Sequence, residues 1–143
     1  MKEIQVMSRR KAIDFSYKIP NQEKKYAIIS ISEVSDTYPN FHYSQNLVDV
    51  LKLSFDDVDK NENGCYRMSF MDAIKIVDFL KKNEDKIDVL IVHCLAGRSR
   101  SAGVAAAIAK WKFHDDSVYF KEYTPNMHVY RTLLNALVES EQE

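Results

Sequence analysis

One stretch constrains the fold of this chain more than any other. The apolar residues 89–92 run directly into residues 93–101, which read His-Cys-Leu-Ala-Gly-Arg-Ser-Arg-Ser, and small residues follow at 102–107. A short apolar run bounded by turn residues favours a buried strand. Two of the three glycines, Gly97 and Gly103, lie in or just after this stretch. Gly97 permits a tight turn that a Cβ would obstruct, and we expect Gly103 to let a helix lie close to the sheet. The sequence therefore predicts a strand, a tight loop and a helix in succession.

The predicted loop combines a cysteine with an arginine. Cys94 stands six residues before Arg100. Backbone N–H groups of such a loop, with a helix N-terminus behind them, form a concavity for an anion, and an arginine can hold two oxygens of a tetrahedral oxyanion. The same environment lowers a cysteine pKa from about 8.5 to roughly 3.5–7.5, so we expect a thiolate. A buried, inert cysteine is the alternative, and the offsets of Gly97, Arg100 and Ser101 from Cys94 argue against it.

This motif resembles the signature of the cysteine-dependent protein tyrosine and dual-specificity phosphatases: Cys94 is followed by five residues and then by Arg100 and Ser101. The resemblance runs from about residue 26 to residue 137. It includes residues 54–58, where the family keeps its general acid, and a Pro-Asn pair at 125–126. It implies an α/β, phosphatase-type three-layer fold, with a central mostly parallel (mixed) sheet of about four to five strands flanked by helices. The cysteine lies about two-thirds along the chain, unlike that of the low-molecular-weight phosphatases, which have it near the N-terminus.

The resemblance implies a role for each loop residue. Cys94 attacks phosphorus to give a cysteinyl phosphate, and Arg100 with the loop amides holds the phosphoryl oxygens. The Ser101 hydroxyl bonds to the sulfur; helix capping is its alternative or additional role. Arg98 faces the pocket mouth or is a solvated charge. Leu95 replaces a lysine common in phosphoinositide-directed relatives, which weakens the case for a lipid substrate. The loop residues expected to surround the phosphate are Leu95, Ala96, Gly97, Arg98 and Ser99.

The general acid must be a carboxyl group on a neighbouring loop, because the leaving oxygen needs a proton. Asp56, Asp57 and Asp59 follow a predicted strand, and the carboxyl ends of parallel strands meet at one edge of a sheet. The resemblance favours Asp57, because the family's acid lies three or four residues past the last strand-like position. Asp56 is the second candidate and Asp59 the third.

Two other polar residues are expected to support the site. His93 precedes the cysteine, and we expect it to order the loop from beneath through hydrogen bonds. A proton-shuttle role for His93 is less favoured, because the ring would point away from the phosphate. The resemblance implies that Asn126 positions the hydrolytic water; an ordinary place in the first turn of a helix is the alternative.

Hydrophobic periodicity gives the remaining elements. Strands are expected at residues 26–31, 50–55 and 89–93, with an edge strand near 4–7. Helices are expected at residues 69–82, with Ser69 as N-cap and an apolar face of Phe70, Ala73, Ile74, Val77 and Leu80, and at 101–113. A further helix is expected to begin at Thr124, with Pro125 in its first helical position, and a short one to run from Ser8 to Phe15. Alternating strands and helices favour an α/β fold.

Composition restricts the classes of partner. The 143 residues are expected to form one domain, residues 1–143, with 45% hydrophobic and 29% charged residues. A formal net charge of −1 gives no overall attraction to nucleic acid or membranes. We expect no signal peptide, no membrane span and, with two cysteines, a reducing cytoplasm. Residues 59–64 resemble the start of a calcium-binding loop, but Phe70 stands where that loop needs a glutamate. We therefore expect no metal and no other cofactor.

The leading hypothesis is a monomeric phosphatase of phosphotyrosine in proteins or peptides. The short chain is expected to give a shallow pocket that also admits phosphoserine and phosphothreonine. A second hypothesis is a phosphatase of a non-protein substrate, either a phosphoinositide or an RNA 5′-triphosphate. A third is a non-catalytic phosphate-binding module.

Overall fold

The computed structural model describes residues 1–142, and a parallel β-sheet lies at its centre. The four strands are β1 (Glu3–Ser8), β2 (Tyr26–Ser32), β3 (Leu47–Ser54) and β4 (Val89–Cys94), in the order β1-β4-β2-β3. All three neighbouring pairs are parallel. The helices are α1 (Arg9–Ser16), α2 (Phe70–Asn83), α3 (Arg100–Phe113), α4 (Ser117–Glu122) and α5 (Met127–Ser140), with a 3₁₀ turn η1 (Ile19–Asn21) after α1. The predicted three-layer α/β fold is confirmed, with every strand parallel.

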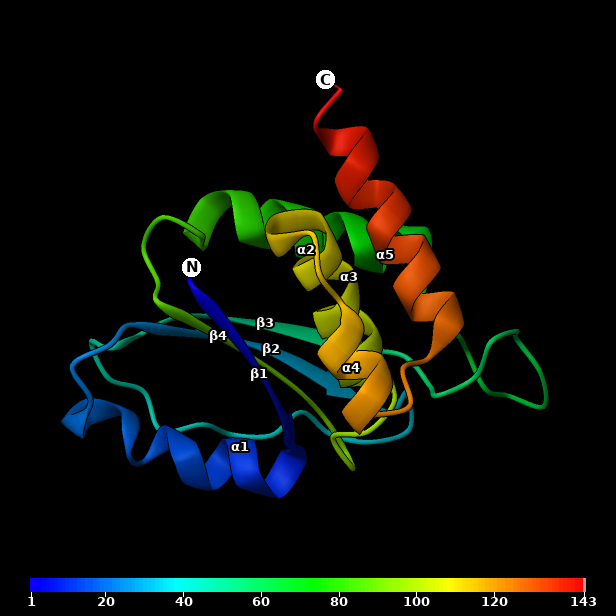
Figure 1. Cartoon of the computed structure of the whole chain (residues 1–143). Helices are drawn as coiled ribbons and strands as arrows, with labels where there is room; N and C mark the ends of the chain where they lie inside the picture. Colours follow the sequence, from blue (N-terminus) through cyan, green and yellow to red (C-terminus); the bar gives the residue numbers. More distant parts are fainter. Residues whose placement is uncertain (143) are drawn as a thin grey trace.

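The helices form a layer on each side of the sheet. Helix α1 covers one face, and α2 to α5 lie over the other (Figure 1). The two inner strands, β2 and β4, are buried along their whole length, as is usual for parallel strands covered on both faces. Their side chains alternate between two hydrophobic cores. Ile28 and Ile91 face the smaller core beside α1, whereas Ile29 and Val92 face the larger one.

The start of α5 differs from the prediction. Asn126, and not Thr124, is the N-cap, because its side-chain oxygen accepts a hydrogen bond from Val129 N. The backbone N–H groups of Thr124 and Asn126 donate instead to the carbonyls of Arg98 and Ser99. Residues 124–126 are therefore hydrogen-bonded to the cysteine loop, and α5 begins after them, at Met127.

Two further predictions about the helices need correction. Phe70 is 55% exposed, because the buried face of α2 consists of Ala73, Ile76, Val77, Phe79, Leu80 and Asn83. A Cβ on Gly103 would lie 2.8 Å from the Asn126 carbonyl oxygen, so this glycine permits close approach to residues 126–129 rather than to the sheet. Ser69 does cap α2, and its backbone N–H donates a reciprocal hydrogen bond to the Asp72 carboxylate; Ser8 caps α1. Among the described residues, no helix is long and apolar enough to cross a bilayer.

Candidate active site

The predicted strand, loop and helix are present in the predicted order. Cys94 is the last residue of β4, residues 95–99 form the loop, and Arg100 is the first residue of α3. Gly97 has a positive φ of 69°, and a Cβ there would approach the backbone of Met7 and Ser8 to 2.6 Å. Only glycine fits this position without strain. The loop therefore packs tightly against the end of β1.

The Cys94 thiol lies inside a set of hydrogen-bond donors. The residue is 2% exposed, and its Sγ is 3.1 Å from Ser101 Oγ. Burial raises the pKa of the Cys94 thiol, but hydrogen bonds from the Ser101 hydroxyl and from the backbone N–H groups of Ser101, Gly97 and Arg98 lower the pKa by more. The pKa is therefore below its ordinary value, because donors that point at a sulfur stabilise its anionic form.

The Arg100 guanidinium is buried beside this loop. Nη1 donates to the Phe55 carbonyl at 3.0 Å, and Nη2 lies 3.8 Å from Glu33 Oε1. Nε is buried and has no hydrogen-bond partner among residues 1–142. A buried N–H left unpaired costs about 1–3 kcal/mol, so this atom is suited to an anionic oxygen.

Asp57 lies against the loop, and Asp56 does not. Asp57 Oδ1 accepts hydrogen bonds from Ser99 Oγ at 2.8 Å and from Asn126 Nδ2 at 2.9 Å. The carboxylate of Asp56 accepts from the backbone N–H groups of Val34 at 3.2 Å and Tyr66 at 2.7 Å. Asp56 therefore ties two loops together, while the exposed carboxyl of Asp57 faces the loop that carries the cysteine. The Asp59 carbonyl accepts from Arg67, and no hydrogen bond joins Asp59 to the cysteine loop.

Two residues at the edge of the candidate active site, Glu33 and Arg9, were not identified by the sequence analysis. Glu33 follows β2 and pairs with Arg100. Arg9 begins α1, and its backbone N–H donates to the Leu95 carbonyl at 3.1 Å. Both residues follow strands that neighbour β4, so the rule that sites form at the carboxyl edge of parallel strands was the available signal. Leu95 is 53% exposed, and Arg98 lies over the Tyr123 ring.

Comparisons with known proteins identify the fold. No family model matches the chain, and no curated protein matches its sequence. A human tyrosine phosphatase-like serine/threonine/tyrosine-interacting protein is 17% identical, with a TM-score of 0.68 and 99% of each chain covered. The chain has the dual-specificity phosphatase fold. The PTP-2 phosphatase of Cydia pomonella is 21% identical, with a TM-score of 0.60, over 94% of this chain and 86% of the other. PTPMT1, solved in complex with PI(5)P, is 17% identical, with a TM-score of 0.59, over 98% and 92%.

In this dual-specificity phosphatase fold, the ring of His93 is buried next to Cys94. Its Nε2 is 2.6 Å from Ser30 Oγ and its Nδ1 is 3.3 Å from the Cys94 carbonyl oxygen. Burial is the largest cause that lowers the pKa of His93; the hydrogen bond to Cys94 opposes it, and the nearby cations Arg9 and Arg100 add to the lowering, so that the pKa is about 4. The ring is therefore neutral at pH 7. Among the described residues, no group of three or more His, Cys, Asp or Glu is placed to hold a metal ion.

This buried histidine should make the stability of the chain depend on pH. The pKa of His93 is about 4 when folded and 6.5 in its unperturbed form, so between these values the unfolded chain binds more protons. The free energy of unfolding should therefore fall as the pH decreases from about 6.5 to about 4, by up to about 3 kcal/mol from this group. Urea unfolding of the wild type and of His93→Gln at several pH values measures the difference. A pH dependence that is the same in both proteins would contradict this expectation.

Proposed function

We propose that this chain hydrolyses the phosphate monoester of phosphotyrosine in proteins or peptides, through a cysteinyl-phosphate intermediate. One observation carries the proposal: Cys94 Sγ receives hydrogen bonds from the Ser101 hydroxyl and from N–H groups of its own loop. A structural cysteine has no need of this arrangement, whereas a nucleophilic thiolate does. The fold that the chain shares with the solved PTP-2 phosphatase of Cydia pomonella supports the same conclusion.

In the first step, the Cys94 thiolate attacks phosphorus and the bond to the leaving oxygen breaks. Asp57, in its protonated form, gives its proton to that oxygen. The loop N–H groups and the guanidinium of Arg100, including its unpaired Nε, stabilise the charge on the three remaining phosphoryl oxygens. Glu33 and the Phe55 carbonyl hold the guanidinium in place.

In the second step, water attacks phosphorus, the phosphorus–sulfur bond breaks, and the thiolate and inorganic phosphate are released. The Asp57 carboxylate takes a proton from the attacking water. The Ser101 hydroxyl, 3.1 Å from Sγ, donates to the departing sulfur and makes it a better leaving group. Asn126 is a positioning residue for this step: its Nδ2 donates to Asp57 Oδ1, and it acts on the water through that carboxylate.

We further propose that the substrate is a phosphorylated protein or peptide that the chain meets as a monomer in a reducing compartment such as the cytoplasm. Both cysteines are free thiols, and the mechanism requires the thiol of Cys94. Phosphoserine and phosphothreonine are expected as additional substrates. The exposed, neutral Leu95 beside the cysteine offers no cation to a second phosphate group, which favours a peptide over a phosphoinositide.

A side-by-side substrate panel tests this proposal. The panel holds p-nitrophenyl phosphate, one peptide sequence phosphorylated on tyrosine, serine or threonine, a phosphoinositide in detergent, and an RNA 5′-triphosphate. We expect the phosphotyrosine peptide to have the highest kcat/KM among the physiological esters. A higher value for the phosphoinositide or the RNA would overturn the substrate class. Failure to hydrolyse any member would favour a phosphate-binding module.

A further inference from the structure

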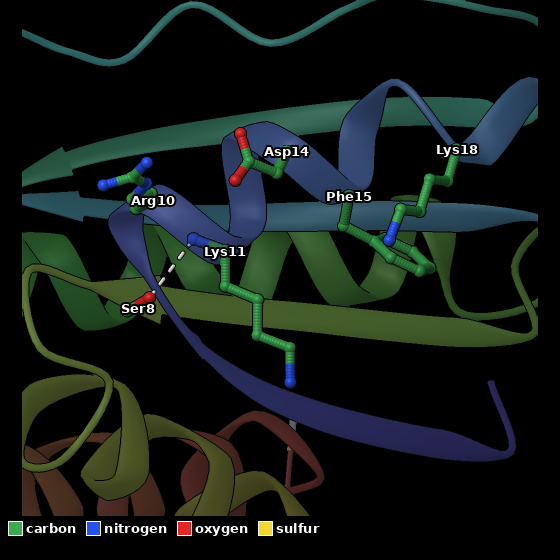
Figure 2. Close-up of a pocket in the computed structure, with 6 residues that line it drawn as sticks. All are labelled: Ser8, Arg10, Lys11, Asp14, Phe15 and Lys18. Carbon is green, nitrogen blue, oxygen red and sulfur yellow. Dashed lines mark hydrogen bonds between the residues drawn. The ribbon is translucent and has the colours of Figure 1, made fainter.

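A cavity of about 260 Å³ lies beside the cysteine loop and has no part in the proposed mechanism. Its lining residues are Arg9, Arg10, Ile13, Asp14 and Leu95. We call it the flanking cavity. A second hollow, of about 330 Å³, lies along the same helix and shares Arg10 and Asp14 with it. Figure 2 shows this second hollow, with Arg10 and Asp14 on a different side of α1 from Lys11.

The flanking cavity adjoins the cysteine loop through Leu95. Leu95 lines it and directly follows the nucleophile. The backbone N–H of Arg9 donates to the Leu95 carbonyl, and Ser8 at the end of β1 is paired in register with Cys94 at the end of β4. Helix α1 therefore begins at the edge of the loop. A peptide whose phosphate occupied the loop would place a neighbouring residue within reach of this cavity.

The lining combines an apolar wall with cations. Leu95 is 53% exposed, and Ile13 is half-buried, so covering their side chains removes apolar surface from water. The Arg9 guanidinium is fixed by the Thr37 carbonyl at 2.9 Å and by Asp36 at 3.4 Å. Arg10 is exposed, and no hydrogen bond or ion pair of its side chain occurs among residues 1–142. Its charge is therefore available to a carboxylate on a ligand.

We propose that the flanking cavity binds an apolar side chain adjacent to the phosphorylated residue of a peptide, and that Arg10 favours an acidic residue beside it. This inference rests on the proposed function and deepens it. A peptide fits better than a membrane, because a hollow of about 260 Å³ accepts one side chain, whereas a bilayer surface does not enter it.

Matched phosphotyrosine peptides test the inference. Two peptides differ only in having leucine or serine next to the phosphotyrosine, and a third adds a glutamate beside the leucine. For the wild type we expect kcat/KM to be about tenfold higher for leucine than for serine, the usual discrimination by an apolar pocket. We expect a further gain of about threefold from the glutamate, which high salt removes. Ile13→Ala should bring the leucine-to-serine ratio close to one, and Arg10→Glu should reverse the gain from glutamate.

Lys75→Glu is the matched control, because it makes the same change of charge as Arg10→Glu. Lys75 is an exposed residue of α2 and lines neither the proposed catalytic site nor the flanking cavity. It should keep both ratios of the wild type. Thermal unfolding shows whether each variant is folded. If Ile13→Ala proves unstable, Arg10→Glu still tests the inference, because it changes only an exposed side chain.

Equal kcat/KM for the leucine and serine peptides, with normal hydrolysis of p-nitrophenyl phosphate, overturns this inference alone. Preference for phosphoinositide vesicles that depends on Arg10 overturns it in favour of a membrane. If the wild type hydrolyses none of these substrates, the proposed function is overturned as well.

Discussion

Replacing Cys94 with serine should abolish hydrolysis of every phosphate ester while phosphate-ester binding remains measurable. Serine has nearly the same size, but its hydroxyl does not ionise near neutral pH, so the nucleophile is lost. The loop N–H groups and Arg100, which hold the phosphoryl oxygens in the proposed mechanism, are unchanged. Removal of a catalytic nucleophile typically lowers kcat by about 10⁴-fold or more. Turnover of p-nitrophenyl phosphate measures the loss, and calorimetric titration with a phosphotyrosine peptide measures the binding.

The second cysteine provides the matched control for this experiment. Cys65 is a half-buried free thiol whose backbone closes a turn with Glu62. Cys65→Ser should keep wild-type turnover. If Cys94→Ser retained turnover, or if Cys65→Ser lost it, the nucleophile would be misassigned.

The second large effect is expected at Asp57. Asp57→Ala removes the proposed proton donor, so kcat should fall by about 10²–10⁴-fold for a phosphotyrosine peptide, whose leaving group needs protonation. The fall should be much smaller for p-nitrophenyl phosphate, because p-nitrophenolate leaves without a proton. The ratio of the two losses is the diagnostic quantity, since a general loss of folded protein would lower both rates equally.

Asp56→Ala is the control for Asp57→Ala, because the two residues are adjacent. The Asp56 carboxylate accepts two backbone hydrogen bonds, from Val34 and Tyr66. Its removal should lower the free energy of unfolding by about 1 kcal/mol and should affect both substrates alike. If Asp56→Ala instead showed the dependence on the leaving group, the acid assignment would be wrong by one residue.

The loop was predictable from sequence because its information is local. Cys94, Gly97, Arg100 and Ser101 all lie within eight consecutive residues, and the apolar runs around them determine the strand and the helix. The inner strands were predictable for a similar reason: burial on both faces produces a continuous apolar run. The sequence placed Asp56 and Asp57 near the site, but it could not show which of the two carboxylates contacts the cysteine loop. Only the tertiary structure brings Ser99 and Asn126 to Asp57.

The parts that sequence reasoning missed depend on distant contacts. Arg100 is held by Phe55 and Glu33, which are 45 and more residues away along the chain. The start of α5 was misplaced because the N–H groups of Thr124 and Asn126 bond to the cysteine loop, a competition that local propensity does not include. Helix α4 has no buried residue, so it gives no periodic apolar pattern to detect.

The charge state of one sulfur atom is the central claim, and its titration is the most direct test. The rate of alkylation of Cys94 by iodoacetamide is measured against pH in a Cys65→Ser background, so that a single thiol reacts. The hydrogen bonds to Sγ lower the pKa of Cys94, so the midpoint should lie clearly below the ordinary value of about 8.5, and Ser101→Ala should move it upward. A midpoint at or above about 8.5 in the folded protein, unchanged by Ser101→Ala, would contradict the account.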